Sequence, residues 1–157
     1  SNLFYSNPII IDEDKVIIST DLHLYILNKY NGSVIFRIPI TSSVIPQISG
    51  KNIFFTTADN LLVCINLITG KISYSVDVSK SIAVFLKTKN KSIIIKSLSI
   101  VNNRLFVILD NSYVVKFNPI GRIQEIKKFP QKIDSFPIFI DKKIFFLTKN
   151  KKLVILN

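Results

Sequence analysis

The sequence predicts an all-β fold, a β-propeller built from four-stranded antiparallel blades. The chain repeats with a period of 38 residues, each copy holds short apolar runs separated by polar turns, and no segment keeps the 3.6-residue apolar period of a helix. Periods of this size are typical of solenoids, propellers and arrays, and four strands in about 40 residues make one blade. The alternative is a β-sandwich with accidental self-similarity, which does not explain Asn and Gly recurring in register.

The repeat is clearest around an asparagine and the glycine that follows it. This pair closes three copies: Asn28 with Gly32, Asn66 with Gly70, and Asn118 with Gly121. Neighbouring positions match as well: Val16 with Phe54, Leu24 with Leu62, and Phe36 with Tyr74. Asn157 takes the asparagine's place in a fourth copy, which stops before its glycine. We therefore expect a single propeller segment over residues 1–157, with blades at about 7–45, 46–95, 96–134 and 135–157.

The last of these four blades is incomplete, and the chain has no Met at position 1. Propellers close with four to eight or so blades, and blades of this style usually belong to the larger rings. We therefore expect the chain to be a fragment of a ring of about eight blades.

Within the first copy, four strands are expected at 8–11, 15–20, 23–28 and 33–38. They are rich in Ile, Val, Phe and Tyr, and turn residues bound each one. Before the fourth strand, the Asn side chain can accept a bond from the backbone two residues on, and Gly supplies the positive φ that closes the hairpin. Unbroken apolar runs such as 53–55 predict middle strands that are buried on both faces.

The second copy carries the one large departure from the repeat. Asn118 lies 52 residues after Asn66, and the 14 additional residues fall between Asp77 and Lys96. This insertion, at about 80–95, is the one place where we expect a short helix or an extra hairpin.

The net charge is +11, and it is concentrated in the second half. Residues 78–157 hold 16 Lys and Arg against four Asp and Glu, whereas residues 1–77 hold five against six. This asymmetry predicts a basic surface for an acidic protein, anionic lipid or nucleic acid; the alternative is solvated loop tips. Lys far outnumbers Arg, which is favoured for bidentate phosphate contacts, so no nucleic acid is expected. The candidate partner-binding residues are Lys87, Lys89, Lys91, Lys127 and Lys128.

The residues that usually carry chemistry do not keep their type across the copies. Cys64 stands where other copies have Ile or Lys, so we interpret it as a space-filling residue. His23 is the only histidine and has no cluster of Cys or carboxylates around it in the sequence. The carboxylates at 12–14 are interpreted as a solvated turn. We therefore predict no catalytic, cofactor-binding or metal-binding residues, and no enzyme.

No part of the sequence predicts a membrane span or a signal peptide. The longest apolar runs are five or six residues, far below the 20 or so that a spanning helix needs.

The second copy resembles the PQQ-like, or quinoprotein-type, propeller repeat. That repeat has the signature L-x-A-L-(D/N)-x-x-T-G-x-x-x-W, and residues 62–74 read Leu-Val-Cys-Ile-Asn-Leu-Ile-Thr-Gly-Lys-Ile-Ser-Tyr. Residues 24–36 follow the same pattern, and the resemblance extends more weakly over 7–157. Phe36 and Tyr74 replace the family's tryptophan, which docks neighbouring blades together.

The resemblance implies one of two functions. Quinoprotein dehydrogenases of this family bind the quinone and Ca²⁺ with an acidic base, a stacking Trp and often a vicinal Cys pair, and none of these is identifiable in the chain. The other branch, the outer-membrane assembly lipoproteins, is non-catalytic and periplasmic. We therefore expect an envelope scaffold that binds a protein partner without a cofactor. A fragment of a quinoprotein dehydrogenase is the alternative, and a sensor or polyanion-binding module is a second one.

The blades at the two ends of the segment have open edges. Open edges invite pairing with another chain, so self-association is expected.

Overall fold

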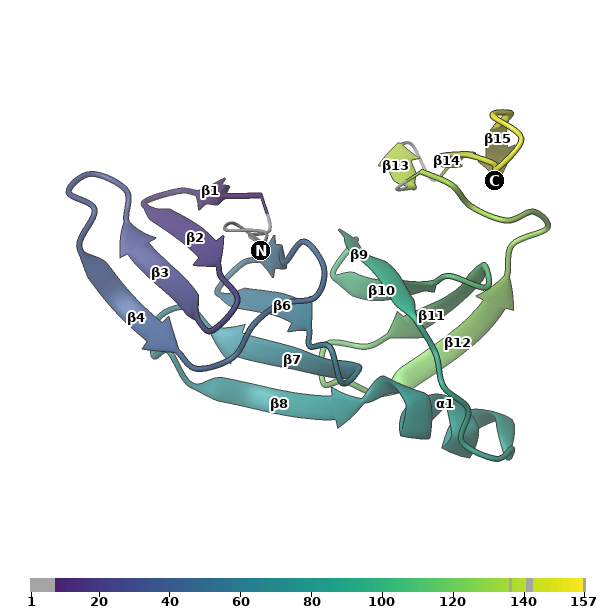
Figure 1. Cartoon of the computed structure of the whole chain (residues 1–157), viewed down its shortest axis with the longest axis horizontal. Helices are drawn as coiled ribbons and strands as arrows, with labels where there is room; N and C mark the ends of the chain where they lie inside the picture. The colour runs from purple at the N-terminus through teal and green to yellow at the C-terminus, as the bar shows by residue number, and fades with distance from the viewer. Residues whose placement is uncertain (1–7, 136, 141–142, 157) are drawn as a thin grey trace.

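The computed structural model of the chain describes residues 8–135, 137–140 and 143–156. Their strands form three four-stranded sheets and one three-stranded sheet, and each sheet is an antiparallel meander in chain order. The sheets follow one another in an open arc rather than a closed ring (Figure 1). The predicted all-β propeller architecture is confirmed.

The strands lie where the turn chemistry places them, within one or two residues. The first sheet contains β1 Ile10–Asp12, β2 Lys15–Ser19, β3 Leu24–Asn28 and β4 Val34–Ile38. The second contains β5 Gln47–Ser49, β6 Asn52–Thr56, β7 Leu61–Asn66 and β8 Ile72–Asp77. The third contains β9 Ile95–Val101, β10 Arg104–Leu109, β11 Tyr113–Phe117 and β12 Ile123–Lys128. The fourth contains β13 Ile138–Ile140, β14 Lys143–Leu147 and β15 Leu153–Leu156.

The turn between the third and fourth strands has the predicted mechanism in all three complete copies. The Oδ1 atoms of Asn28, Asn66 and Asn118 accept hydrogen bonds from the backbone N–H two residues on, at 2.8, 2.9 and 3.1 Å. The glycines that follow have φ of +69°, +68° and +80°. Each turn therefore satisfies its own backbone and holds the hairpin closed.

The pairing registers correct one of the sequence matches. Ile26 and Cys64 are equivalent, and their partners on the second strands are Ile17 and Phe54, respectively. The counterpart of Phe54 is therefore Ile17, and the predicted match with Val16 is wrong by one residue. The connection before Leu62 is one residue longer than the connection before Leu24, which shifts the second strand by one position.

Aromatic rings dock each of the first two sheets onto the glycine turn of the next. A Cβ built on Gly70 would lie 2.5 Å from Cδ1 of Phe36, and one built on Gly121 would lie 2.8 Å from Cε2 of Tyr74. A Cβ on Gly32 would meet nothing within 4 Å. Glycine thus has two roles at 70 and 121: it adopts the positive φ, and it leaves room for a ring.

Apolar side chains fill the spaces between consecutive sheets. The first space is centred on Ile26, Phe55 and Ile65, the second on Leu62, Val107 and Phe117, and the third on Ile108 and Phe146. Adjacent residues of β6, such as Phe54 and Phe55, are both buried because a sheet lies on each side of this strand.

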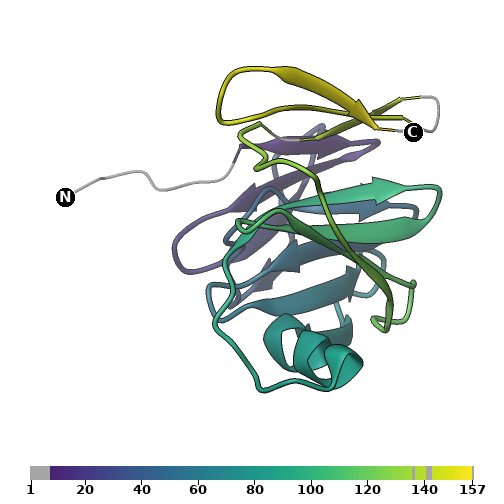
Figure 2. The same ribbon diagram turned by 90° about the vertical axis from the view of Figure 1, so that its right-hand side faces the viewer.

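The joint between the third and fourth sheets is built differently. In the second sheet, Phe54, Cys64 and Tyr74 are neighbours across three adjacent strands. At the equivalent positions of the third sheet, the neighbours are Phe106, Lys116 and Glu125. A part-exposed ion pair, 3.9 Å between Lys116 Nζ and Glu125 Oε2, therefore stands where a docking ring would stand. The fourth sheet lies away from α1 at the other end of the molecule (Figure 2).

The insertion forms the helix α1, Val78–Leu86, which was one of its two predicted structures. Asp77 caps its N-terminus by accepting a hydrogen bond from the Lys80 N–H at 2.9 Å. Val78 and Ala83 are its buried residues. The helix contacts β8 and β12, the outer strands of the second and third sheets, and so bridges two blades at their rim (Figure 1).

Candidate functional site

A cleft of about 270 Å³ lies between α1 and the third sheet. We call it the helix cleft. The helix contributes Ile82 and Leu86 to its lining, and the third sheet contributes Tyr113 and Ile126. Lys89 and Lys91, in the connection from α1 to β9, complete the lining with polar groups. The result is a concave apolar surface with ammonium groups beside it, built by the insertion.

The structure brings three of the five predicted lysines to this cleft. Lys89 and Lys91 line it directly. Lys128 joins them because its Nζ lies 5.6 Å from the centre of the Tyr113 ring, one wall of the cleft. At this distance the cation is attracted by the face of a ring that lines the cleft, which places the ammonium group beside it.

The other two lysines have different positions. Lys87 follows the helix in the left-handed conformation, with φ of +52°, and ends it by donating its backbone N–H to the last turn. Lys127 is the neighbour of Lys128 on β12, so its side chain leaves the opposite face of the strand. There its Nζ lies 3.0 Å from Oε1 of Glu125. That hydrogen bond lowers the pKa of the Glu125 carboxyl below its ordinary value.

Three lysines of the basic cluster have no neutralising group in the part of the chain that the structure describes. Among the described residues, no carboxylate lies within 4 Å of the ammonium groups of Lys87, Lys89 or Lys91. Each of these lysines is exposed. The cleft and the connection beside it therefore present uncompensated positive charge, which attracts acidic groups from solution.

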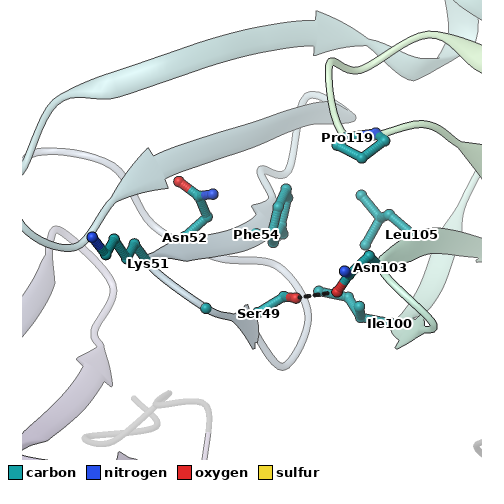
Figure 3. A pocket seen from close by; sticks show the side chains of 9 residues that line it. Ser49, Lys51, Asn52, Phe54, Ile100, Asn103, Leu105 and Pro119 are labelled. Atoms are coloured by element: carbon teal, nitrogen blue, oxygen red, sulfur yellow. Dashed lines mark hydrogen bonds between the residues drawn. The ribbon is translucent and has the colours of Figure 1, made fainter.

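A second concave site lies between the second and third sheets, where Figure 3 shows its lining. This pocket of about 400 Å³ has an apolar floor that includes Phe54 and Leu105, and a polar rim that includes Lys51. Ser49 Oγ donates to Asn103 Oδ1 across it at 3.4 Å, so the first-to-second strand turns of neighbouring blades meet here. No pair in the drawn lining joins a nucleophile to a base, and so we treat it as a groove between blades.

The cysteine, the histidine and the carboxylates at 12–14 lie on different strands and turns of the structure. Cys64 is buried in the second sheet, and burial raises the pKa of its thiol, which disfavours the reactive thiolate. His23 precedes β3 with its ring centre 5.7 Å from that of Tyr25. Of the carboxylates at 12–14, Asp12 belongs to β1 rather than to the turn, and Asp14 pairs with Lys15 at 2.5 Å.

The part of the chain that the structure describes contains neither a metal-binding cluster nor a membrane-spanning helix. Within residues 8–135, 137–140 and 143–156, no three or more His, Cys, Asp or Glu side chains are grouped so that they hold a metal ion. No helix in the same ranges has the length and apolar character needed to cross a membrane.

Sequence reasoning missed the apolar half of the site. Tyr113 and Ile126 appear in the sequence as ordinary strand residues, and only the folded insertion brings α1 over them. A usable signal was present in the apolar run at 82–86, which directly precedes the Lys-rich connection and contains Ile82 and Leu86 of the cleft lining.

Comparison with known proteins supports the architecture. No protein-family model matches the sequence, and no curated protein matches it. Among solved structures, the chain is similar to BamB from Moraxella catarrhalis, with a TM-score of 0.75 and 11% identity over 95% of this chain and 42% of that chain. The chain thus spans less than half of that BamB.

Two further structures have the same arrangement of strands. The computationally designed Ika4 protein has a TM-score of 0.69 and 10% identity, covering 99% of this chain and 92% of that chain. BBS1N, solved in complex with ARL6DN, has a TM-score of 0.67 and 16% identity, covering 97% and 50%. At these identities the likeness establishes the propeller fold and leaves function to be argued from the chain's own surface.

Proposed function

We propose that the chain is a non-enzymatic propeller scaffold of the cell envelope that binds a protein partner through the helix cleft and its basic rim. Similarity to BamB in fold supports the envelope location and, as the specific role, a part in outer-membrane protein assembly. The observation that carries the proposal is the insertion. It interrupts a regular repeat, and the helix it forms creates a concave apolar surface beside lysines that have no carboxylate within 4 Å among the described residues. Exposed sites of this composition fit protein interfaces.

A photo-crosslinking residue tests the proposed surface. It replaces Lys89 in the cleft rim in one variant and Lys71, an exposed lysine in the turn before β8, in the control. Incubated with an envelope fraction of the source organism, the Lys89 variant is expected to form a protein adduct that the Lys71 variant lacks. Equal adducts from both variants, or adducts with nucleic acid alone, would contradict the proposal.

The alternative of a quinoprotein dehydrogenase makes the opposite prediction for ligand binding. A titration of the purified chain with pyrroloquinoline quinone and Ca²⁺ is expected to show no saturable binding. Stoichiometric binding would overturn the scaffold proposal and favour the dehydrogenase.

We also propose that the 157-residue chain self-associates through the outward faces of its first and fourth sheets. Ile11 and Ile138, on these two faces, are 62% and 59% exposed. The inner sheets bury apolar side chains on both faces, as Phe54 and Phe55 show. Exposed apolar residues on a sheet face are typical of association sites. Sedimentation is expected to show a dimer, and a monomer at high concentration would refute this proposal.

A further inference from the structure

A second groove lies on the other side of α1 from the helix cleft. We call it the helix groove. It is about 350 Å³, and its lining includes Val76 at the end of β8 and Ile123 at the start of β12. Val84 and Phe85 of α1 also line it, and Gly121 contributes only backbone. The groove is therefore a shallow, mainly apolar depression between the helix and the rims of two blades.

The apolar residues of α1 along this groove remain largely exposed to water. Val84 is 79% exposed and Phe85 is 45% exposed, whereas Val78 and Ala83 are the buried residues of the helix. Leaving these side chains in water forgoes the stabilisation that burial would give. Their exposure is explained if another molecule covers them.

The lining of the groove also carries positive charge. Lys80 and Arg122 are exposed and line it together with the apolar residues. The Lys80 ammonium lies 3.7 Å from the Asp77 carboxylate, whose other oxygen caps the helix. Among the described residues, no carboxylate lies within 4 Å of the Arg122 guanidinium. A planar guanidinium beside the apolar helix groove is suited to bidentate contact with the carboxylate of a bound molecule.

We infer that the helix groove binds a short peptide segment of the partner protein in which an apolar residue is adjacent to Asp or Glu. The inference rests on the proposed scaffold function and names the chemistry of what is bound. The apolar side chain enters the groove between Val84 and Ile123, and the carboxylate reaches Arg122. The volume is at the lower end for ligand sites and accommodates side chains of a peptide rather than the surface of a folded domain.

The composition of the site favours a peptide over a membrane surface. Amphipathic helices that bind lipid surfaces combine a large apolar face with a Lys- and Arg-rich polar face on one helix. Here the apolar surface is shared between the helix and two strand ends, which contribute Val76 and Ile123, and the lining has two basic residues. An extended segment or a single helical turn can lie in this shallow groove and contact all three elements at once.

A random peptide library displayed on phage, selected on the immobilised 157-residue chain, tests the inference. The enriched peptides are expected to combine Leu, Ile or Phe with neighbouring Asp or Glu. Affinities of the enriched peptides are then measured by fluorescence anisotropy for the wild type and for Val84→Glu and Arg122→Glu. Each substitution is expected to weaken binding about tenfold or more, which corresponds to the loss of one well-formed contact of about 1.4 kcal/mol.

Matched controls separate the groove from general surface charge. Ile68→Glu and Lys71→Glu place the same changes on an exposed apolar and an exposed basic residue of the β7–β8 turn, and both are expected to leave the affinity within about twofold. All four sites are exposed, so the variants are expected to fold, which circular dichroism verifies.

Three results would overturn the inference: no enrichment, enrichment of peptides without acidic residues, and peptides whose affinity is unchanged by Val84→Glu and Arg122→Glu. Binding of the chain to anionic vesicles that is lost in these same two variants would assign the groove to lipid instead. If the crosslinked partner from the Lys89 experiment is still captured by both groove variants, the scaffold function stands and the groove inference fails.

Discussion

Replacing Gly70 by alanine measures how strongly ring docking holds neighbouring blades together. The substitution imposes a side chain at φ +68° and places a Cβ 2.5 Å from the Phe36 ring. The left-handed conformation costs an L-residue about 1–2 kcal/mol. Forcing a ring out of a packed interface adds about 1–3 kcal/mol. The free energy of unfolding is therefore expected to fall by about 2–5 kcal/mol.

Gly32→Ala is the matched control. Gly32 occupies the same turn at φ +69°, with its N–H bonded to the Asn28 carbonyl as that of Gly70 is bonded to Asn66, but a Cβ there meets nothing within 4 Å. Only the conformational cost of about 1–2 kcal/mol applies to it. The difference between the two variants isolates the ring contact.

The free energies of unfolding are measured by urea titration followed by circular dichroism. The slope of the free energy against urea concentration should be the same in all variants. In a thermal scan, the extra loss for Gly70→Ala corresponds to about 2–4 °C per kcal/mol for a chain of this size. Adding Phe36→Leu to Gly70→Ala is expected to cost less than Phe36→Leu costs alone, because the clash is relieved. Equal destabilisation by Gly32→Ala and Gly70→Ala would refute the docking argument.

Three other variants or reagents test local parts of the structure. Asn66→Ala removes the side chain that accepts hydrogen bonds from the Ile68 and Thr69 N–H groups at 2.9 and 3.1 Å. It is expected to lower the free energy of unfolding by about 0.5–2 kcal/mol in urea titrations. An unchanged value would mean that water replaces these two hydrogen bonds. The Cys64 thiol is expected to react with an aromatic disulfide reagent only after unfolding, since it is buried and burial raises its pKa; rapid reaction in buffer would contradict the packing. The pKa of Glu125 is lowered in the fold. The carboxylate therefore contributes to the free energy of unfolding above its ordinary pKa of 4.5, and this contribution is lost as the pH falls through the lower pKa of the folded state. Glu125→Gln is therefore expected to be destabilised slightly at pH 7, by less than about 1 kcal/mol because the pair is exposed, and to match the wild type in acid; a gap that widens in acid would refute the assignment.

Local chemistry determines most of what the sequence predicts correctly. The Asn and Gly turns act within five residues, and so their spacing alone places the strands on either side. The match of Val16 with Phe54 failed for the same reason: one additional residue in a connection changes the register, and counting a fixed period cannot detect it. Register is set by pairing across the sheet, which is not local.

The site was less predictable because it depends on which faces meet. The five lysines form one group in the sequence, yet alternation along β12 sends Lys127 to Glu125 and Lys128 to the cleft. The sequence of the insertion did not by itself distinguish a helix from a hairpin. Its helical form follows from the Asp77 cap and from burial of Val78 and Ala83 against the blades, and the burial is a tertiary effect.

The third-to-fourth joint is where we expect this molecule to open first. Its part-exposed Lys116–Glu125 pair contributes little. The joint does contain a stacked ring pair, Phe129 and Phe146 with centres 5.1 Å apart, but among the described residues its buried apolar cluster has five members, against nine and twelve at the other two joints. The fourth sheet is therefore expected to be attached more weakly than the others. Backbone amides of β14 are therefore expected to exchange with deuterium through a separate opening, with a lower free energy than the opening that exposes the amides of β7, which is buried between two sheets. The segment is thus expected to behave as two cooperative units of unequal stability: a three-blade body, and a final sheet that can detach while the body stays folded.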